Sequence, residues 1–385
     1  MRSVFKHLLK SNLSLIGKLM GCLAPLCCLT CTSPVDIAPG GFTPSLVVEG
    51  FISDDVGPHE IRITRIGKFT NVLRGGAIER VEASVNIIDD VGNRIPMERR
   101  EVVRKDIFNN PPGCAPSVAL VTVRTNYLTP DDFQAQLGRT YTLEIIVDDQ
   151  IYRSEPQTII PTPEIDSLRV IFQEIPTLNE FVPDSGFDII ASWKDDPGDD
   201  FYTWRINGIY RIATPQQPAP ACCLFDPRDG GEDDCWILEN DIEDNVAALS
   251  DRFFNGQVAT EKVGFIKDDG LRFASELVPG DKQYYVQVEQ YRISEEAFNF
   301  YENIDIIASI DGEIFDPPPL GIRGNITNMA DPEELVIGFF GAFSAQKKDV
   351  FISRSEVPFT QRFPRPCGDC RVRAGAQVEI PEPYK

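Results

Sequence analysis

Cysteine is the residue type whose spacing in this chain points most directly to chemistry. Four of the ten cysteines lie within the first 31 residues, and six are spread over the rest of the chain. A thiol can form a disulfide, bind zinc or receive a lipid, and the cellular compartment helps to decide among these reactions. The early cysteines are Cys22, Cys27, Cys28 and Cys31, and the later ones are Cys114, Cys222, Cys223, Cys235, Cys367 and Cys370.

The early cysteines end a segment with the layout of an export signal. Four basic residues lie among the first 18, and an apolar run follows at 19–29. This run is too short for a membrane-spanning helix, and its flanks are those of a secretory signal. Cysteine at the cleavage site is typical of a bacterial lipoprotein, in which the acylated thiol becomes the first mature residue. We therefore predict a lipoprotein signal peptide at 1–30 and, from its Pro, Gly and Ser content, a tether at 31–44.

Two cysteines compete as the acylated residue. Cys31 follows the whole apolar run, whereas Cys22 has the usual small residue before it but almost no apolar run ahead. Cleavage before Cys31 leaves six other cysteines, an even number, and cleavage before Cys22 would leave nine. We favour Cys31 and keep Cys22 as the alternative. An ordinary signal peptide with chance cysteines is a further alternative.

The six later cysteines are all disulfide candidates, because exported proteins pass through an oxidising compartment. Cys367 could pair with Cys370, and Cys222 or Cys223 could pair with Cys235. Six cysteines allow fifteen connectivities, so the sequence leaves the pairing open. A zinc site that combines the Cys-x-x-Cys pair with Cys222 and Cys223 is the alternative.

Acidic residues crowd one predicted turn and supply the hard oxygen ligands that calcium prefers. The turn lacks the glycine and glutamate spacing of an EF-hand loop, and a merely solvated acidic turn is the alternative interpretation. The weak calcium candidates in this turn are Asp195, Asp196, Asp199 and Asp200.

The overall charge limits the classes of partner. The chain has 37 Lys and Arg against 59 Asp and Glu, and its formal net charge is −22. Removing the predicted signal takes away four basic residues, so the mature chain would stand at 33 minus 59, or −26. Such a field repels nucleic acid and anionic lipid headgroups. We expect no nucleic-acid partner and only the lipid anchor as the link to a membrane.

No motif in the sequence supports catalysis. The mature chain contains a single histidine, His59, next to a proline at a predicted turn. The sequence has no Gly-x-Ser-x-Gly elbow, no His-Glu-x-x-His helix and no phosphate-binding glycine loop. Carboxylates are so abundant that their proximity in sequence does not identify a glycosidase pair. We expect a protein that is not an enzyme and has no cofactor.

Aromatic residues suggest a binding surface instead. Alternation places Trp193 and Trp204 in the core, whereas Trp236 follows a cysteine in a long loop with several prolines. Long loops in compact domains often carry function. Trp236 is therefore the candidate exposed ring for contact with a ligand.

These residues need a scaffold, and the hydrophobic pattern of the chain predicts one made of strands. Apolar and polar residues alternate at 46–52, 61–66, 81–87 and 141–147, with turn residues between them. Prolines at 161 and 163 interrupt the pattern, and proline blocks strand pairing. We therefore predict an N-terminal β-sandwich at 45–160 and a C-terminal β-rich domain at 161–385.

The C-terminal domain should contain a hairpin and a helix. Asn207-Gly208 between two alternating stretches is a strong hairpin signal. Ser294, followed by two glutamates and apolar residues at helical spacing, predicts a helix near 294–309. The predicted fold is mainly β: two tandem antiparallel sandwiches of the immunoglobulin or fibronectin kind, the second with one helix and a long cysteine-containing loop.

A series of short segments spans most of the chain after the predicted signal. They are 46–52 (LVVEGFI), 138–143 (GRTYTL), 155–156 (EP), 161–167 (PTPEIDS), 315–319 (FDPPP), 323–326 (RGNI) and 367–370 (CGDC). Taken in this order, the segments resemble the lipoprotein family called domain of unknown function 4249. The resemblance implies an outer-membrane lipoprotein of Bacteroidota, often encoded beside a TonB-dependent receptor, with no established enzymatic activity. We expect a lipid-anchored binding partner of such a transporter in nutrient uptake. A structural or adhesive surface lipoprotein is the alternative, and a glycan hydrolase is a further one.

Overall fold

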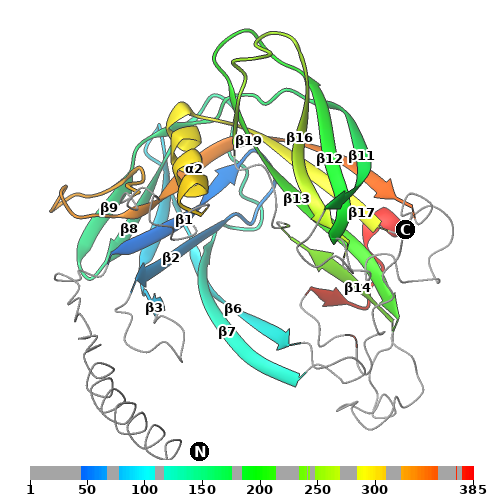
Figure 1. Ribbon diagram of the computed structural model, residues 1–385. Coiled ribbons are helices and arrows are strands. Elements are labelled where there is room, and N and C mark those ends of the chain that lie inside the picture. Colours follow the sequence, from blue (N-terminus) through cyan, green and yellow to red (C-terminus); the bar gives the residue numbers. More distant parts are fainter. Residues whose placement is uncertain are drawn as a thin grey trace, which may run out of the picture. The chain divides into compact units, whose positions relative to one another are not determined.

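The computed structural model describes residues 45–66, 78–108, 117–175, 184–213, 234–240, 242, 248–268, 284–308, 322–353, 370 and 375–385. The predicted signal peptide and tether lie outside these residues, as do both candidate acylation sites, Cys31 and Cys22. Lipid anchoring therefore stays a prediction. The described structure is mainly β, with several antiparallel sheets and one helix, as the alternating pattern indicated (Figure 1).

The first half of the chain supplies two groups of strands whose apolar faces share a core. β1, β2, β7 and β6 lie in one sheet, and β9, β8, β4 and β5 lie in another. Buried alternate positions such as Val48, Ile63 and Leu143 fill the space around one core. The strands are β1 (Leu46–Ser53), β2 (Glu60–Ile66), β3 (Ile78–Arg80), β4 (Ser84–Asp89), β5 (Arg94–Pro96), β6 (Glu98–Phe108), β7 (Ser117–Leu128), β8 (Thr140–Val147), β9 (Gln150–Ser154) and β10 (Gln157–Thr158).

The second half builds a three-stranded sheet, β11-β12-β16, and the run β14-β13-β17-β19 of an 11-stranded sheet. Trp193 and Trp204 are buried in the core that these strands share, as predicted. The elements are β11 (Ile165–Ile175), β12 (Asp184–Lys194), β13 (Phe201–Ala213), β14 (Asp234–Glu239), β15 (Leu249–Ser250), β16 (Val258–Lys267), β17 (Tyr284–Ile293), α2 (Glu295–Ala308), β18 (Ile326–Asn328), β19 (Ile337–Ile352), β20 (Ala376–Gln377) and the 3-10 helix η5 (Glu382–Tyr384).

One strand, β19, belongs to both halves. Its first part pairs in parallel with β1, from Ile337 opposite Val47 onward, and its second part pairs antiparallel with β17. Phe340 of β19 lies in the N-terminal core, whereas Ile352 lies in the C-terminal core. β18 also joins the N-terminal half by pairing with β9. Residues far beyond 161 thus complete the N-terminal core, and residues 44–385 form one compact unit.

The predicted hairpin at Asn207-Gly208 is wrong, because β13 runs straight through these residues. Asn207 lies opposite Gln287, and Gly208 lies opposite Val286, on the neighbouring strand β17. Glycine has a different role here. A Cβ atom at position 208 would lie 2.1 Å from the hydroxyl of Tyr284, so the missing side chain makes room for that ring.

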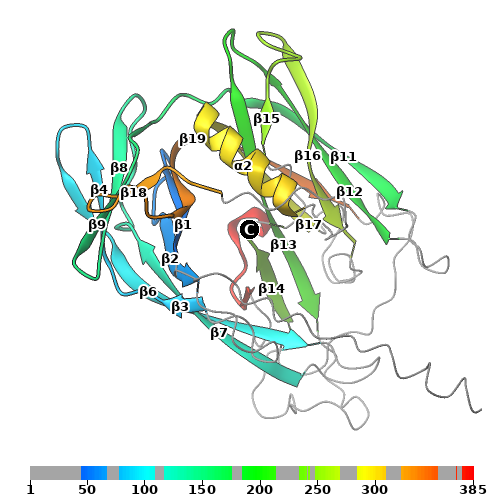
Figure 2. The ribbon, with the colours of Figure 1, turned by 60° about the vertical axis from the view of Figure 1, so that its left-hand side comes forward.

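The predicted helix is confirmed as α2. Its first turn is capped by Ser294, whose Oγ accepts a hydrogen bond of 3.2 Å from the backbone N–H of Ala297. Ala297 and Phe300 pack with Phe339 and Phe343 of β19 in a third small core. Figure 2 shows α2 lying across strands of the large sheet. The described residues include no helix with the length and apolar character needed to cross a membrane.

Candidate functional site

Two strand ladders bring three aspartates together. Asp195 directly follows β12, where Lys194 pairs with Val258, and its backbone N–H continues this ladder by donating to Gln257 at 2.9 Å. Asp200 directly precedes β13, and Asp251 directly follows β15. Because Phe201 pairs with Ser250, the next pair outward is Asp200 and Asp251, linked by a backbone hydrogen bond of 2.9 Å. The register of the strands therefore fixes all three positions.

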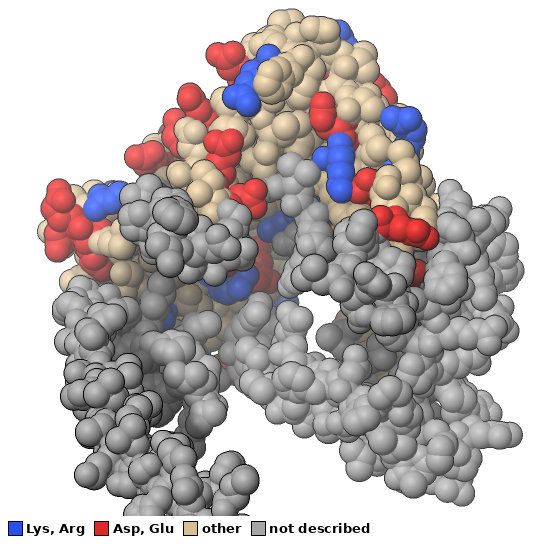
Figure 3. Space-filling model, in the orientation of Figure 1, with Lys and Arg blue, Asp and Glu red and all other residues tan. Residues whose placement is uncertain are grey.

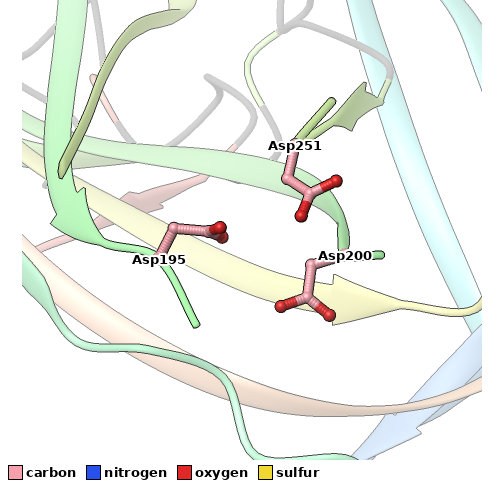
Figure 4. A group of neighbouring side chains, drawn as sticks. All are labelled: Asp195, Asp200 and Asp251. Carbon is pink, nitrogen blue, oxygen red and sulfur yellow. The ribbon is translucent and has the colours of Figure 1, made fainter. Parts of the chain in front are cut away.

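The three carboxylates are close together and almost completely buried. Asp195, Asp200 and Asp251 are 1%, 2% and 2% exposed. One oxygen of each side chain lies within 4.8 Å of one oxygen of each other side chain. Figure 4 shows Asp195 pointing toward the gap between the other two. Acidic side chains are seldom buried this fully unless they are paired or bind a metal, so the group calls for a chemical explanation.

Each carboxylate oxygen of Asp195 accepts one hydrogen bond. Its Oδ1 accepts a hydrogen bond of 2.6 Å from the hydroxyl of Tyr202, and its Oδ2 accepts one of 2.8 Å from the backbone N–H of Gly256. Burial and the hydrogen bond to Asp195 raise the pKa of Tyr202, which keeps the phenol protonated as a donor. These contacts hold the Asp195 carboxylate in one orientation.

Asp200 and Asp251 each have one carboxylate oxygen without a hydrogen-bond partner among the described residues. The guanidinium of Arg292 binds Oδ1 of Asp200, and its other branch lies 3.6 Å from exposed Asp196. Oδ2 of Asp200 and Oδ2 of Asp251 are buried without a hydrogen-bond partner among the described residues. Burial raises the pKa of Asp200, although Arg292 opposes this rise, and burial with the nearby charge of Asp195 raises the pKa of Asp251. These two unpartnered oxygens can accept a metal ion.

Aromatic packing holds the two turns that carry the carboxylates. The Trp193 ring lies 5.3 Å from Tyr202 and 5.6 Å from Phe254, measured between ring centroids. Phe254 belongs to the turn after Asp251 and is 7% exposed. Asn255 in the same turn exchanges hydrogen bonds with the backbone of Gly198 in the other turn. The carboxylates therefore sit in a rigid setting with a packed apolar core beneath them.

The structure brings together only two of the four predicted calcium candidates. Asp195 and Asp200 come together, whereas Asp196 and Asp199 are exposed on the same turn. Asp251 was missed, because it lies 51 positions beyond Asp200 and follows a strand of only two residues. Only the pairing of β15 with β13 brings it close, and no local sequence pattern reports that pairing.

The structure pairs Cys235 with Cys370 in a disulfide, with the two Cα atoms 5.8 Å apart. The suggested pairings of Cys370 with Cys367 and of Cys235 with Cys222 or Cys223 are therefore wrong. Cys370 also cannot supply a thiolate to the alternative zinc site. The reason is the pairing of β14 with β20, which brings the C-terminal segment beside Cys235. The other candidates, Cys114, Cys222, Cys223 and Cys367, lie outside the described residues.

The prediction that Trp236 is an exposed ring is wrong. Trp236 lies inside strand β14 and is 8% exposed. The ring of Tyr384 near the C-terminus packs against it at 4.2 Å between centroids. Tyr384 is held there because its hydroxyl donates to the backbone oxygen of Ile209 at 2.7 Å. Trp236 is thus unavailable as a ligand contact in this structure.

An aromatic ring other than that of Trp236 is exposed at the surface, and the surface carries charges of both signs. Phe253, in the turn between Asp251 and Phe254, is 82% exposed, with the guanidinium of Arg252 over its face at 4.6 Å. Figure 3 shows acidic and basic side chains interspersed over the described part of one face.

Comparison with known proteins finds a family match. A family model described as "Domain of unknown function (DUF4249)" matches residues 32–349. No curated protein and no solved structure matches the chain.

Proposed function

The chain belongs to the DUF4249 family, and we propose that it is a lipid-anchored binding protein of the outer membrane rather than an enzyme. Its role would be that of an accessory to a TonB-dependent transporter in nutrient uptake. The proposal rests on the leader and on the family resemblance described above.

The observation that carries the proposal is the position of Cys31. This residue follows the whole apolar run of the leader, and the family match begins at residue 32, directly after it. The leader and the family region therefore meet at the cysteine that a lipoprotein signal would acylate. An acylated thiol at this point would hold the folded unit beside a membrane through the short tether at 31–44.

The burial of the carboxylate group favours binding over hydrolysis. A glycosidase needs two carboxyl groups that reach a sugar ring in an open site. Asp195, Asp200 and Asp251 form a closely spaced acidic group, but none of them is more than 2% exposed. A substrate would have to displace packed side chains to reach them. The group fits a structural role better than a catalytic one.

Metabolic labelling with a fatty acid tests the anchor. The wild-type chain and Cys22→Ser should incorporate the label and fractionate with the outer membrane, whereas Cys31→Ser should lose the label and become soluble. An unmodified N-terminus in a soluble wild-type protein would refute the anchor.

Co-purification tests the partner separately. The tagged wild-type protein, extracted from its native membrane with mild detergent, should carry a transporter barrel in roughly stoichiometric amount, and an untagged strain provides the control. A correctly acylated protein that purifies without a barrel would refute the transporter role and favour the structural or adhesive alternative.

A further inference from the structure

The buried aspartates carry an inference that is independent of the anchor and the transporter. We propose that Asp195, Asp200 and Asp251 form a calcium site that fastens the three-stranded sheet to the large sheet.

The charge of the group is the first argument. Three buried carboxylates and the guanidinium of Arg292, which binds Asp200, leave a formal charge of −2. Uncompensated charge is strongly unfavourable in a buried setting, and carboxylates at this spacing also repel one another. One divalent cation would balance the remaining charge. Calcium fits because it takes carboxylate oxygens in flexible arrangements of six to eight ligands.

The unpartnered oxygens are the second and independent argument. Oδ2 of Asp200 and Oδ2 of Asp251 are buried and lack a hydrogen-bond partner among the described residues. Both belong to side chains that are 98% buried, and nearly all buried polar atoms in folded proteins have a partner. Arg292 occupies only Oδ1 of Asp200, so the second oxygen is left to a ligand. A cation in contact with both oxygens would satisfy them together.

The preorganisation of Asp195 is the third argument. Tyr202 and Gly256 each donate one hydrogen bond to it, and an ionised carboxylate oxygen can still accept a second ligand. The donors come from different elements, strand β13 and the turn that follows Asp251, so Asp195 is fixed before any ion arrives. A ligand held in place loses little conformational freedom on binding, which favours affinity.

The place of the site in the fold gives it a structural role. Asp195 is attached to β12 of the three-stranded sheet, whereas Asp200 and Asp251 are attached to β13 and β15 of the large sheet. An ion bound by all three would link the two sheets at the edge of their common core. Its removal would leave the repulsion among the carboxylates uncompensated at that edge.

Thermal unfolding of the full chain tests the proposal. After dialysis against a chelator, addition of calcium at 100 times its Kd should raise Tm by about 5 °C. Asp251→Asn should weaken calcium binding by about tenfold or more and reduce the Tm shift in parallel. Asp199→Asn is the matched control, since Asp199 lies on the same turn but is exposed. This control should bind calcium with wild-type affinity.

Terbium luminescence keeps the test decisive if Asp251→Asn does not fold. In the wild-type chain, excitation of Trp193 and Tyr202 should sensitise one bound terbium ion, and calcium should displace it. The proposal would be overturned by a wild-type Tm that calcium leaves unchanged, or by terbium emission that calcium does not compete away. Calcium binding that survives in folded Asp251→Asn would also overturn it. A metal-insensitive wild type that Asp251→Asn stabilises would indicate that a proton, not an ion, neutralises the group.

Discussion

The side-chain amide of Asn325 makes both of its hydrogen bonds to the backbone of one residue, Phe340. Nδ2 of Asn325 donates to the Phe340 oxygen at 2.8 Å, and Oδ1 accepts from the Phe340 N–H at 2.9 Å. Asn325 therefore acts as a short piece of strand beside β19, at the place where β18 joins the N-terminal core.

Replacing Asn325 by alanine should destabilise the fold substantially. Asn325 is 6% exposed, so the backbone groups of Phe340 would be left without partners and without access to water. We expect a loss of about 2–4 kcal/mol in the free energy of unfolding, measured by urea denaturation. Asn303→Ala is the control, because Asn303 is an exposed residue of α2 that bonds only within its helix. An unchanged midpoint for Asn325→Ala would contradict the role assigned to this amide.

Gly338 is required because the backbone of Val48 approaches it closely. Its φ is +109°, and an added Cβ would lie 1.8 Å from the oxygen of Val48 on β1. Gly338→Ala should therefore push β19 away from β1 in addition to straining the backbone. A substitution at Gly92 separates backbone strain from close contact. The φ of Gly92 is +89°, but no atom would lie within 4 Å of an added Cβ. We expect Gly92→Ala to lower Tm by a few degrees at most and Gly338→Ala to lower it much more or to prevent folding. Equal effects would show that strain alone matters.

The disulfide should contribute strongly to stability. It joins residues that are 135 positions apart, and the loop-entropy model gives about 4–5 kcal/mol for a loop of this size. The double variant Cys235→Ser/Cys370→Ser should unfold at a clearly lower urea concentration than the wild type under non-reducing conditions. Non-reducing peptide mapping should recover a peptide in which Cys235 is linked to Cys370. Recovery of Cys367 linked to Cys370 would refute this pairing.

The ion pairs of Glu144 should make the stability of the protein depend on pH in the acid range. Its carboxylate is 2% exposed and binds both Arg94 and Arg153. The hydrogen bond from Arg94, with the further pairing to Arg153, holds the pKa of Glu144 below its unfolded value of 4.5, while burial opposes this shift. The stabilisation is therefore present above the unfolded pKa and is lost as pH falls through the lower folded pKa.

The variant Glu144→Gln should isolate this contribution. At neutral pH it should be less stable than the wild type by about 1–3 kcal/mol, and the gap should narrow below about pH 4. Urea midpoints measured across this range check both statements. Glu82→Gln is the control, since the Glu82 side chain is 84% exposed and should show no comparable gap. A difference in stability between Glu144→Gln and the wild type that does not change with pH would refute the ionic origin of the stabilisation.

The sequence predicted the local elements well because each depends on neighbouring residues. Alternation identified β1, β2 and β8, and the capping serine with its helical apolar spacing identified α2. Trp193 and Trp204 were placed in the core for the same reason, since they occupy inward positions of their strands. These features follow from the two-residue and 3.6-residue periods of the backbone.

The sequence could not predict features that depend on distant pairing. The parallel pairing of β1 with β19 joins residues nearly 300 positions apart, and the pairing of β15 with β13 alone places Asp251 beside Asp200. Trp236 appeared exposed because the tyrosine that covers it lies at the other end of the C-terminal half. Asn207-Gly208 was wrongly interpreted as a turn, because the sequence does not distinguish a glycine that makes room for a neighbouring ring from a glycine that forms a turn.

The place of β19 determines how the molecule would carry mechanical load. β1 begins at Leu46, close to the N-terminal end of the folded unit, and lies parallel to β19 over seven paired residues. With the C-terminal half held, tension applied to that end would act along the strands, so the evenly spaced hydrogen bonds of the parallel pair would be loaded together in shear rather than opened one after another. β19 would then pass the force through β17 into the other core. The shared strand thus makes both cores bear a pull applied at one end of the chain.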